Sequence, residues 1–137
     1  MSQPATLSLR GRPICPGQAR GEALVTGMGL SFFGGVDPDS GVVVENGHEL
    51  YGKSIAGKIL VFPTGKGSTV GSYTLYRLKK NGLAPCAIIN SECETITAVG
   101  CIISDIPCID QIEIGFLHTG RILRVDGETG TVEMVEA

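Results

Sequence analysis

The sequence predicts a mixed α/β fold in which one or two main helices pack on a small sheet or barrel. Short β-rich runs stand at both ends of the chain, a strand–helix–strand pattern lies between them, and 20 glycines separate the runs. The length of 137 residues and the mass of 14.3 kDa are those of one ordinary domain. We therefore expect residues 1–137 to form a single domain that buries a core without disulfides or metals.

The N-terminal third contains two predicted strands and a long loop. The runs "TLSLRGRPI" (6–14) and "GEALVTG" (21–27) are β-rich or alternate in polarity, as strands do. The segment "SFFGGVDPDSGVVVENG" (31–47) is predicted to be a loop, because "DPDSG" has the residues of a tight turn. Its "VVV" (42–44) is β-branched and suits a strand edge.

The centre of the chain predicts a buried strand followed by a helix. The apolar run "SIAGKILVFP" (54–63) is typical of a buried strand that ends at its proline. A helix is expected over 69–81, because large side chains recur at helical spacing: Val70, Tyr73 and Tyr76. Two lysines in the last turn complement the helix dipole, and Gly82 fits the position after the helix end.

The last third continues the pattern and closes with a hairpin. "APCAIINSE" (84–92) predicts a second buried strand, and "CETITAVGC" (93–101) a short helix. "IISDIPCID" (102–110) predicts a short strand and a loop. "RILRVDGETGTVEMVE" (121–136) predicts two strands joined at "DGETG".

Composition excludes some classes of function and favours others. The net charge of −3 and the lack of a basic block argue against nucleic-acid binding. No apolar run reaches the length of a membrane span, and the N-terminus lacks the apolar stretch of a secretory signal, so we expect a cytoplasmic protein. Only 18% of the residues are charged. This favours a subunit that buries an apolar face against a partner.

The five cysteines are predicted to be reduced thiols. Their number is odd and no CxxC pair occurs, which argues against a disulfide framework and a zinc site. The trio Cys93, Cys101 and Cys108 lacks the short spacings of iron–sulfur motifs. Cys101 stands among apolar residues and is predicted to be a buried small hydrophobe. No metal site is therefore expected in this chain.

The segment "TGKGSTVGS" (64–72), here called the glycine loop, predicts an anion site. Glycines allow backbone to close on a ligand, and the N–H groups that begin a helix attract negative charge. Lys66 adds a positive charge, and hydroxyls that could donate hydrogen bonds or act as nucleophile or base follow it: Ser68, Thr69 and Ser72. A simpler interpretation makes Ser68 only an N-cap and the glycines a turn.

Familiar catalytic motifs do not fit the glycine loop. The spacing around Lys66 differs from that of a P-loop, and "GKGST" differs from the GxSxG motif of hydrolases. His48 is expected in an exposed loop and His118 in a packing or surface position, so a catalytic triad is not predicted. The other glycine pair, Gly34 and Gly35, is either part of an ordinary loop in which Asp37 bonds its own turn, or a second wall of the site.

Taken together, "LSFFGGVDPDSG" and "FPTGKGSTVGSYTLYRL" resemble the small subunit of the aconitase X family, and the resemblance covers nearly the whole chain. It implies a fold like the swivel domain of aconitase. It also implies a hydro-lyase that is active only with a large subunit, which carries the iron–sulfur cluster and whose iron acts as Lewis acid on the departing hydroxyl. Members dehydrate small hydroxy acids, either cis-3-hydroxy-L-proline, which gives a pyrroline carboxylate, or mevalonate 5-phosphate.

The resemblance also implies roles for residues. Ser68 would be the base that removes the substrate proton, with Ser72 as the alternative base. The remaining positions would bind substrate: Gly34, Gly35, Gly65, Lys66, Gly67 and Thr69. The family often has Arg where this chain has Lys66, so the carboxylate clamp differs in geometry.

The substrate expectation rests on the cysteines. Hyperthermophile proteins tend to avoid thermolabile cysteine, so the cysteine-rich segment 90–110 favours the hydroxyproline branch over the mevalonate 5-phosphate branch. A rival from another class is a non-catalytic module that binds an anionic ligand at the glycine loop or regulates a partner.

Overall fold

The computed structural model describes residues 8–66 and 70–135 of the chain. Within them, one sheet has the strand order β1-β8-β7-β3-β4-β5-β6-β2. The elements in chain order are β1 (Ser8–Arg10), β2 (Arg12–Cys15), β3 (Gln18–Val25), β4 (Ile59–Phe62), α1 (Gly71–Lys80), β5 (Ala87–Asn90), α2 (Thr95–Ser104), β6 (Cys108–Asp110), a 3₁₀ turn (Ile114–Phe116), β7 (Ile122–Asp126) and β8 (Thr131–Val135). The predicted mixed α/β class is confirmed.

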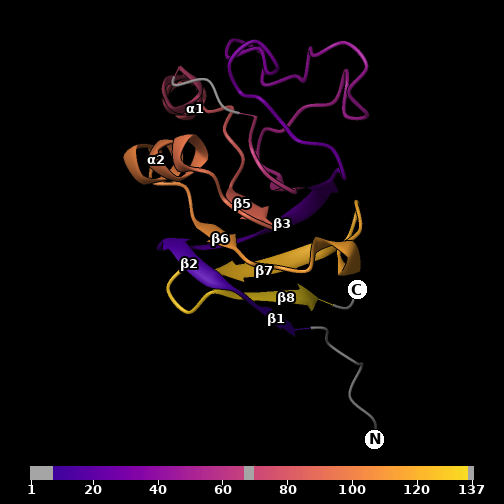
Figure 1. Cartoon of the computed structure of the whole chain (residues 1–137), viewed down its shortest axis with the longest axis vertical. Coiled ribbons are helices and arrows are strands. Elements are labelled where there is room, and N and C mark those ends of the chain that lie inside the picture. The colour runs from indigo at the N-terminus through magenta and orange to yellow at the C-terminus, as the bar shows by residue number, and fades with distance from the viewer. Residues whose placement is uncertain (1–7, 67–69, 136–137) are drawn as a thin grey trace, which may run out of the picture.

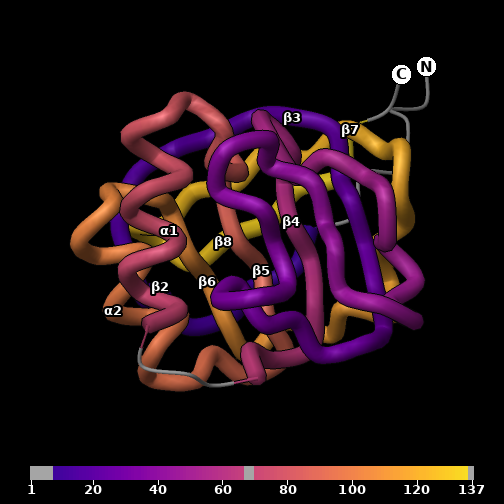
Figure 2. The backbone as a smooth tube through the Cα atoms, turned by 90° about the horizontal axis from the view of Figure 1, so that it is seen from above, coloured from indigo at the N-terminus to yellow at the C-terminus, as the bar shows by residue number. Residues whose placement is uncertain are grey.

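The elements form three layers, with strands below, strands in the middle and helices above (Figure 1). Helices α1 and α2 cover one face of the parallel strands β4, β5 and β6, and β1, β7 and β8 lie on the other side. Both faces of β4 and β5 are buried, so these strands are continuous apolar runs in the sequence. Seen from above, α1 and the long loop of residues 26–58 lie side by side over the sheet (Figure 2).

Each face of the parallel strands has its own hydrophobic core. Alternate residues of β4 point to opposite faces, as in any strand. Toward the helices lies a cluster that includes Leu60, Phe62, Leu75, Leu78 and Ile88. Toward the antiparallel strands lies a second cluster that includes Ile59, Val61, Ile89, Leu123 and Val132.

The sheet curls until its two edges lie one residue apart in the chain. β3 is the hinge of the curl, because it pairs antiparallel with β7 through residues 18–22 and parallel with β4 through residues 23–25. β1 and β2 are the two edges, and only Gly11 separates them. A Cβ at Gly11 would lie 2.0 Å from the carbonyl oxygen of Asp110, so no other residue fits at this crossing. The single strand predicted over 6–14 is broken here.

Two other features differ from the sequence prediction, and one is confirmed. The "VVV" segment makes only the isolated bridges Val36–Val43 and Val42–Ser54, so it belongs to the long loop rather than to a strand. α2 extends to Ser104, three residues beyond the predicted end, and stops at the left-handed Asp105. Gly82 follows α1 with φ +72°, as its predicted position after the helix requires.

Candidate functional site

Polar side chains follow the parallel strands at the edge where all of them end. Thr26 follows β3, Asn90 ends β5 and Asp110 ends β6, and none of the three is more than 1% exposed. The glycine loop follows β4 at the same edge. Ligands of open α/β sheets bind outside the carboxyl ends of the strands. The polar residues that end "AIIN" and "CID" are the signal in the sequence that indicates this edge.

The first part of the glycine loop is held against the segment that follows β3. The N–H of Leu30 donates to the carbonyl of Thr64 at 3.2 Å, and the N–H of Lys66 donates to the carbonyl of Leu30 at 2.9 Å. Residues 30 and 65 form a parallel bridge. The later loop residues Gly67, Ser68 and Thr69 lie outside the described residues, so their predicted roles stay predictions.

Gly65 lies against the start of α2. Glu94 caps this helix: its two carboxylate oxygens accept the N–H groups of Ile96 and Thr97, both at 2.7 Å. A Cβ at Gly65 would lie 2.4 Å from Oε1 of Glu94 and 2.6 Å from Oγ1 of Thr97. Glycine at 65 is therefore required for packing, whatever ligand the loop binds.

Lys66 does not present an unpaired charge. Its Nζ lies 2.8 Å from Oε2 of Glu45, and its side chain is 50% exposed. Oε1 of the same glutamate would lie 3.2 Å from a Cβ at Gly35. Glu45 thus lies between the two glycine motifs, and an anion that binds Lys66 must compete with it.

Ser72 holds the two helices together. It is 8% exposed, and its hydroxyl donates to the carbonyl of Ile96 in α2 at 2.6 Å. Gly100 of α2 faces the same contact, where a Cβ would lie 2.6 Å from Cδ1 of Leu75. The Ser72 hydroxyl is therefore occupied by an interhelical hydrogen bond.

A groove of about 500 Å³ runs between the long loop and the first turns of α1. Its lining is mostly apolar and includes Phe33, Gly34, Val44, Val70 and Tyr73. Phe33 is 53% exposed and Tyr73 is 70% exposed, which is unusual for aromatic side chains. The large side chains at 70 and 73 predicted the helix correctly, but they line this groove instead of the core.

Gly34 and Gly35 play different parts in the structure. Gly34 has φ +79° and open space around it, and it lines the groove. A Cβ at Gly35 would lie 2.1 Å from the carbonyl oxygen of Ser31, so its glycine is explained by packing. The Asp37 carboxylate accepts the N–H of Asp39 at 3.0 Å and the hydroxyl of Ser40 at 2.8 Å, which lowers its pKa. Asp37 therefore bonds its own turn, as the first interpretation of this loop predicted, and the role of Gly34 and Gly35 as a second wall of the site stays a prediction.

The expectation for His48 was wrong. Its side chain is buried, with 4% exposure, because the loop folds back over the segment before Leu30. Nδ1 accepts the N–H of Leu50 at 3.1 Å, so Nε2 carries the proton and donates to the carbonyl of Gly29 at 3.0 Å. The neighbouring Glu49 accepts hydrogen bonds from the Thr26 hydroxyl and the Gly27 N–H, which lower its pKa.

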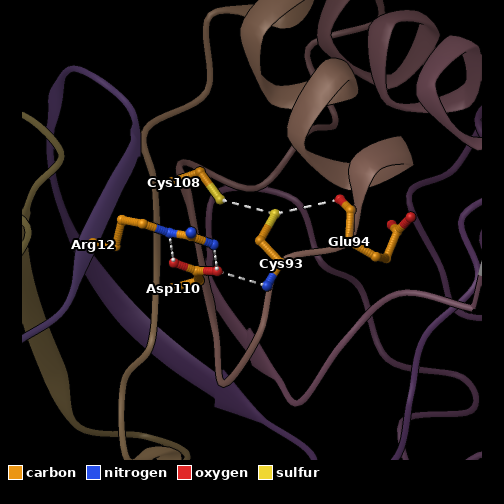
Figure 3. A network of polar contacts seen from close by, with 5 residues as sticks. All are labelled: Arg12, Cys93, Glu94, Cys108 and Asp110. Carbon is orange, nitrogen blue, oxygen red and sulfur yellow. Dashed lines mark hydrogen bonds and ion pairs between the residues drawn. The ribbon is translucent and has the colours of Figure 1, made fainter.

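Asp110 is buried and is the centre of a network of polar contacts (Figure 3). Arg12 donates to both carboxylate oxygens, from Nε at 3.0 Å and from Nη2 at 2.8 Å. The N–H of Cys93 donates to the same carboxylate at 2.9 Å. Burial alone would raise the pKa of Asp110, but these hydrogen bonds outweigh it and the pKa is lowered.

The described residues include no membrane-spanning helix and no metal site. In 8–66 and 70–135, no helix is both long and apolar enough to cross a membrane. Over the same ranges, the His, Cys, Asp and Glu side chains form no group of three or more that could hold a metal ion. All five cysteines are free thiols.

Comparison with known proteins decides the family. The model of the aconitase X swivel domain matches residues 8–134. The chain belongs to this family. A crystal structure of Thermococcus kodakaraensis aconitase X in its holo-form superposes with TM-score 0.94 at 55% identity, covering 95% of this chain and 99% of that one. A solution NMR structure of a UPF0107 protein gives TM-score 0.87 at 48% identity, covering 95% of this chain and 100% of that one.

The sequence relatives of this swivel domain correct the substrate expectation. The chain is 55% identical to the "Phosphomevalonate dehydratase small subunit" of Thermococcus kodakarensis, over 95% of this chain and 98% of the relative. It is 53% identical to the protein of the same name from Methanosarcina acetivorans, over 95% and 92%. The hydroxyproline branch was the wrong choice. Cys15, Cys101 and Cys108 are at most 3% exposed, so they fill the core, and their number carries no information about substrate.

Proposed function

We propose that the chain is the small subunit of an aconitase X-type hydro-lyase that dehydrates mevalonate 5-phosphate together with a large subunit. One observation carries the proposal. Eight relatives that are 49% to 55% identical share the name phosphomevalonate dehydratase small subunit, and each match covers at least 92% of both chains. In this proposal residues 1–137 act as one swivel-like domain in the cytoplasm, and they are active only in the complex.

Ser68 is the proposed base. An alcohol accepts a proton only when its alkoxide is stabilised by N–H groups and positive charge. The glycine loop leads into the N-terminus of α1, where the N–H groups of the first helical turn and the helix dipole can supply both. Each well-placed donor lowers the barrier by about 3 kcal/mol. The hydrogen bond from the Ser72 hydroxyl to Ile96 supports Ser68 over Ser72.

The substrate carries a carboxylate and a phosphate, and the glycine loop offers groups for one of them. We assign the backbone of residues 65–69 and the ammonium group of Lys66 to the substrate anion. Lys66 and Glu45 are both partly exposed, so their ion pair is weak and can exchange for a ligand. Gly34 lines the groove at the start of α1, and we assign its backbone to the same ligand.

The iron–sulfur cluster of aconitase X dehydratases is assigned to the large subunit. The described cysteines and carboxylates of this chain do not form a ligand group that fits a cluster. When bound, the cluster supplies a Lewis acid for the departing hydroxyl. No step proposed for this chain uses its own cysteines.

The groove is the proposed contact with the large subunit. Its exposed Phe33, Val44, Val70 and Tyr73 form an apolar surface beside the glycine loop. A base on this chain and a cluster on another polypeptide can act on one substrate only if the loop lies at the boundary between them. Burial of these side chains would also account for the low charge content of the chain.

Co-expression with the cluster-bearing large subunit tests the proposal. We expect the two chains to co-purify and to remove water from mevalonate 5-phosphate, with no turnover by either chain alone, as measured by mass spectrometry of the product. Turnover of cis-3-hydroxy-L-proline without turnover of mevalonate 5-phosphate would overturn it.

The same co-purification experiment tests whether the groove contacts the large subunit, with a charged residue introduced into it. Tyr73→Glu should abolish co-purification, because it places a carboxylate in an apolar contact. Tyr51→Glu is the matched control, since Tyr51 is 58% exposed and does not line the groove. Equal co-purification of both variants would assign the interface elsewhere.

A further inference from the structure

Four of the five cysteines gather around β6, although Cys15 is far from the other three in the sequence. We call Cys15, Cys93, Cys101 and Cys108 the thiol cluster. Sγ of Cys93 lies 3.9 Å from Sγ of Cys108 (Figure 3). Cys15 on β2 is paired directly with Cys108 on β6, and its thiol donates to the carbonyl of Cys101 at 3.6 Å. Cys86 lies apart, with its thiol facing the carbonyl of Gly57.

We propose that Cys93 and Cys108 form a reversible intrachain disulfide when the protein meets a peroxide. The thiol of Cys93 reacts with hydrogen peroxide to give a sulfenic acid and one water. The thiol of Cys108 then attacks that sulfur, the S–S bond forms and a second water leaves. Two thiols have lost two electrons and the peroxide has gained them. This property is independent of the proposed dehydratase function.

Geometry and access favour this pair over the other pairs in the cluster. The two sulfurs are already in contact and need to approach by about 2 Å to reach bonding distance. Cys93 is half-buried in the short turn between β5 and α2, where no helix or strand ladder resists a shift. The other three cysteines are at most 3% exposed, so an oxidant reaches Cys93 first.

Reaction at neutral pH is expected to be slow. Hydrogen bonding to Cys108 and burial raise the pKa of the Cys93 thiol, and contact with Cys101 raises that of Cys108. The carboxylates of Asp110 and Glu94 act in the same direction on Cys93. Thiolate is the reactive form of cysteine. We therefore expect the pair to react little with mildly oxidising disulfides and to be oxidised only during prolonged exposure to peroxide.

The disulfide would link the residue just before α2 to the strand that follows it. Residues 93–108 contain the whole helix, so the disulfide closes a ring around it. Glu94, the next residue after Cys93, caps α2 and lies against Gly65 of the glycine loop. Oxidation would therefore fix the wall on which the first part of the glycine loop rests.

The test uses the full chain, reduced and then incubated with hydrogen peroxide at neutral pH. We expect the folded protein to lose two hydrogens, about 2 Da by intact mass, and to regain them with dithiothreitol. Trypsin cannot assign the bond, because no Lys or Arg lies between Lys80 and Arg121. A protease that cuts after Glu and Asp can, because Glu94 and Asp105 place the three late cysteines on different peptides.

Two variants and one melting curve complete the test. Cys93→Ser should give no product 2 Da lighter, and Cys86→Ser, the matched control, should form it like the wild type. The oxidised chain should melt several degrees higher than the reduced chain, because the closed ring constrains the unfolded state. A bond from Cys108 to Cys15 or Cys101, oxidation only after unfolding, or only irreversible sulfinic acid would each overturn the proposal.

Discussion

One sheet contains two kinds of strand: the parallel β4, β5 and β6, and the antiparallel β1, β7 and β8. The two halves differ in where their polar side chains lie. Along β7 and β8, inward Leu123 and Val132 alternate with outward Arg124 and Glu133. The polar residues of this half face water and need no particular partner. β4 and β5 are buried throughout, so their half of the sheet has no exposed face for polar groups.

In the parallel half, polar groups therefore concentrate where the strands end. Each one has a specific partner: Thr26 has Glu49, Asn90 donates to the carbonyl of Phe62, and Asp110 has Arg12. Oδ1 of Asn90 is buried without a partner among the described residues. In the proposed function, the antiparallel half therefore supplies stability, while the parallel half also supplies chemistry. Five substitutions test this division; the first has the largest expected effect and the last the smallest.

Ser68→Ala tests the chemistry of the parallel half and has the largest expected effect. Loss of a general base should lower turnover by the two-subunit enzyme by about 10³-fold, while assembly remains intact. The measurement is kcat on mevalonate 5-phosphate beside a co-purification assay. A fall in melting temperature with normal turnover would make Ser68 a helix cap and not a base.

Ser72→Ala separates the two serines in the same assay. Because its hydroxyl donates to Ile96 between the helices, removal should cost about 1 kcal/mol of stability and little turnover. A turnover loss as large as that of Ser68→Ala would contradict the assignment.

Leu123→Ala tests the stability of the antiparallel half. Leu123 is fully buried between the layers, so the cavity should lower the free energy of unfolding by about 3 kcal/mol, as measured by denaturant titration. Turnover per folded molecule should be unchanged. The control is Ile102→Ala, because Ile102 is 58% exposed on α2. Loss of activity in the folded fraction would contradict the proposal that the antiparallel half contributes stability and not chemistry.

Asp110→Asn tests the polar edge and its pH dependence. At pH 7 it should lower the free energy of unfolding by about 2 kcal/mol, because charged hydrogen bonds to a buried carboxylate are lost. The folded pKa of Asp110 is lowered, so its contribution is present above the unfolded pKa and disappears as the pH falls through the folded value. The difference from the wild type should thus shrink below about pH 4.

The matched control for Asp110 is Glu133→Gln in the antiparallel half. The pair of Arg124 and Glu133 is 3.7 Å apart and exposed, so the change should cost about 0.5 kcal/mol or less at any pH. Equal costs for the two substitutions would show that the ends of the parallel strands are no different from the rest of the surface.

Glu45→Gln has the smallest expected effect on stability. It frees Lys66 from a partly exposed ion pair, which is worth about 0.5 kcal/mol or less. If Lys66 binds the substrate anion, KM should fall about two- to fivefold while kcat stays constant, because a competing carboxylate is gone. A rise in KM would show that Glu45 positions Lys66 for binding.

Local patterns predicted the antiparallel half more completely than the site. The hairpin around "DGETG" is recognisable because its alternation and its turn lie within 16 neighbouring residues, 121–136. The glycine loop was also recognisable, since glycines beside a helix start have a physical purpose. Glu45 and Glu94 were not, because each acts on a residue more than 20 positions away. His48 was misplaced for the same reason, as its partner Gly29 belongs to another segment.

The sequence by itself determined the class of fold, most of the order of strands and helices along the chain, and the helix that follows the glycine loop. These follow from periodicity, turn residues and composition, which act over a few residues. Only the tertiary structure decided that the two edges of the sheet meet at Gly11, that Lys66 faces Glu45, and that Cys93 meets Cys108. Contacts of this kind depend on how layers stack, and stacking minimises the free energy of the whole chain and not of any one segment.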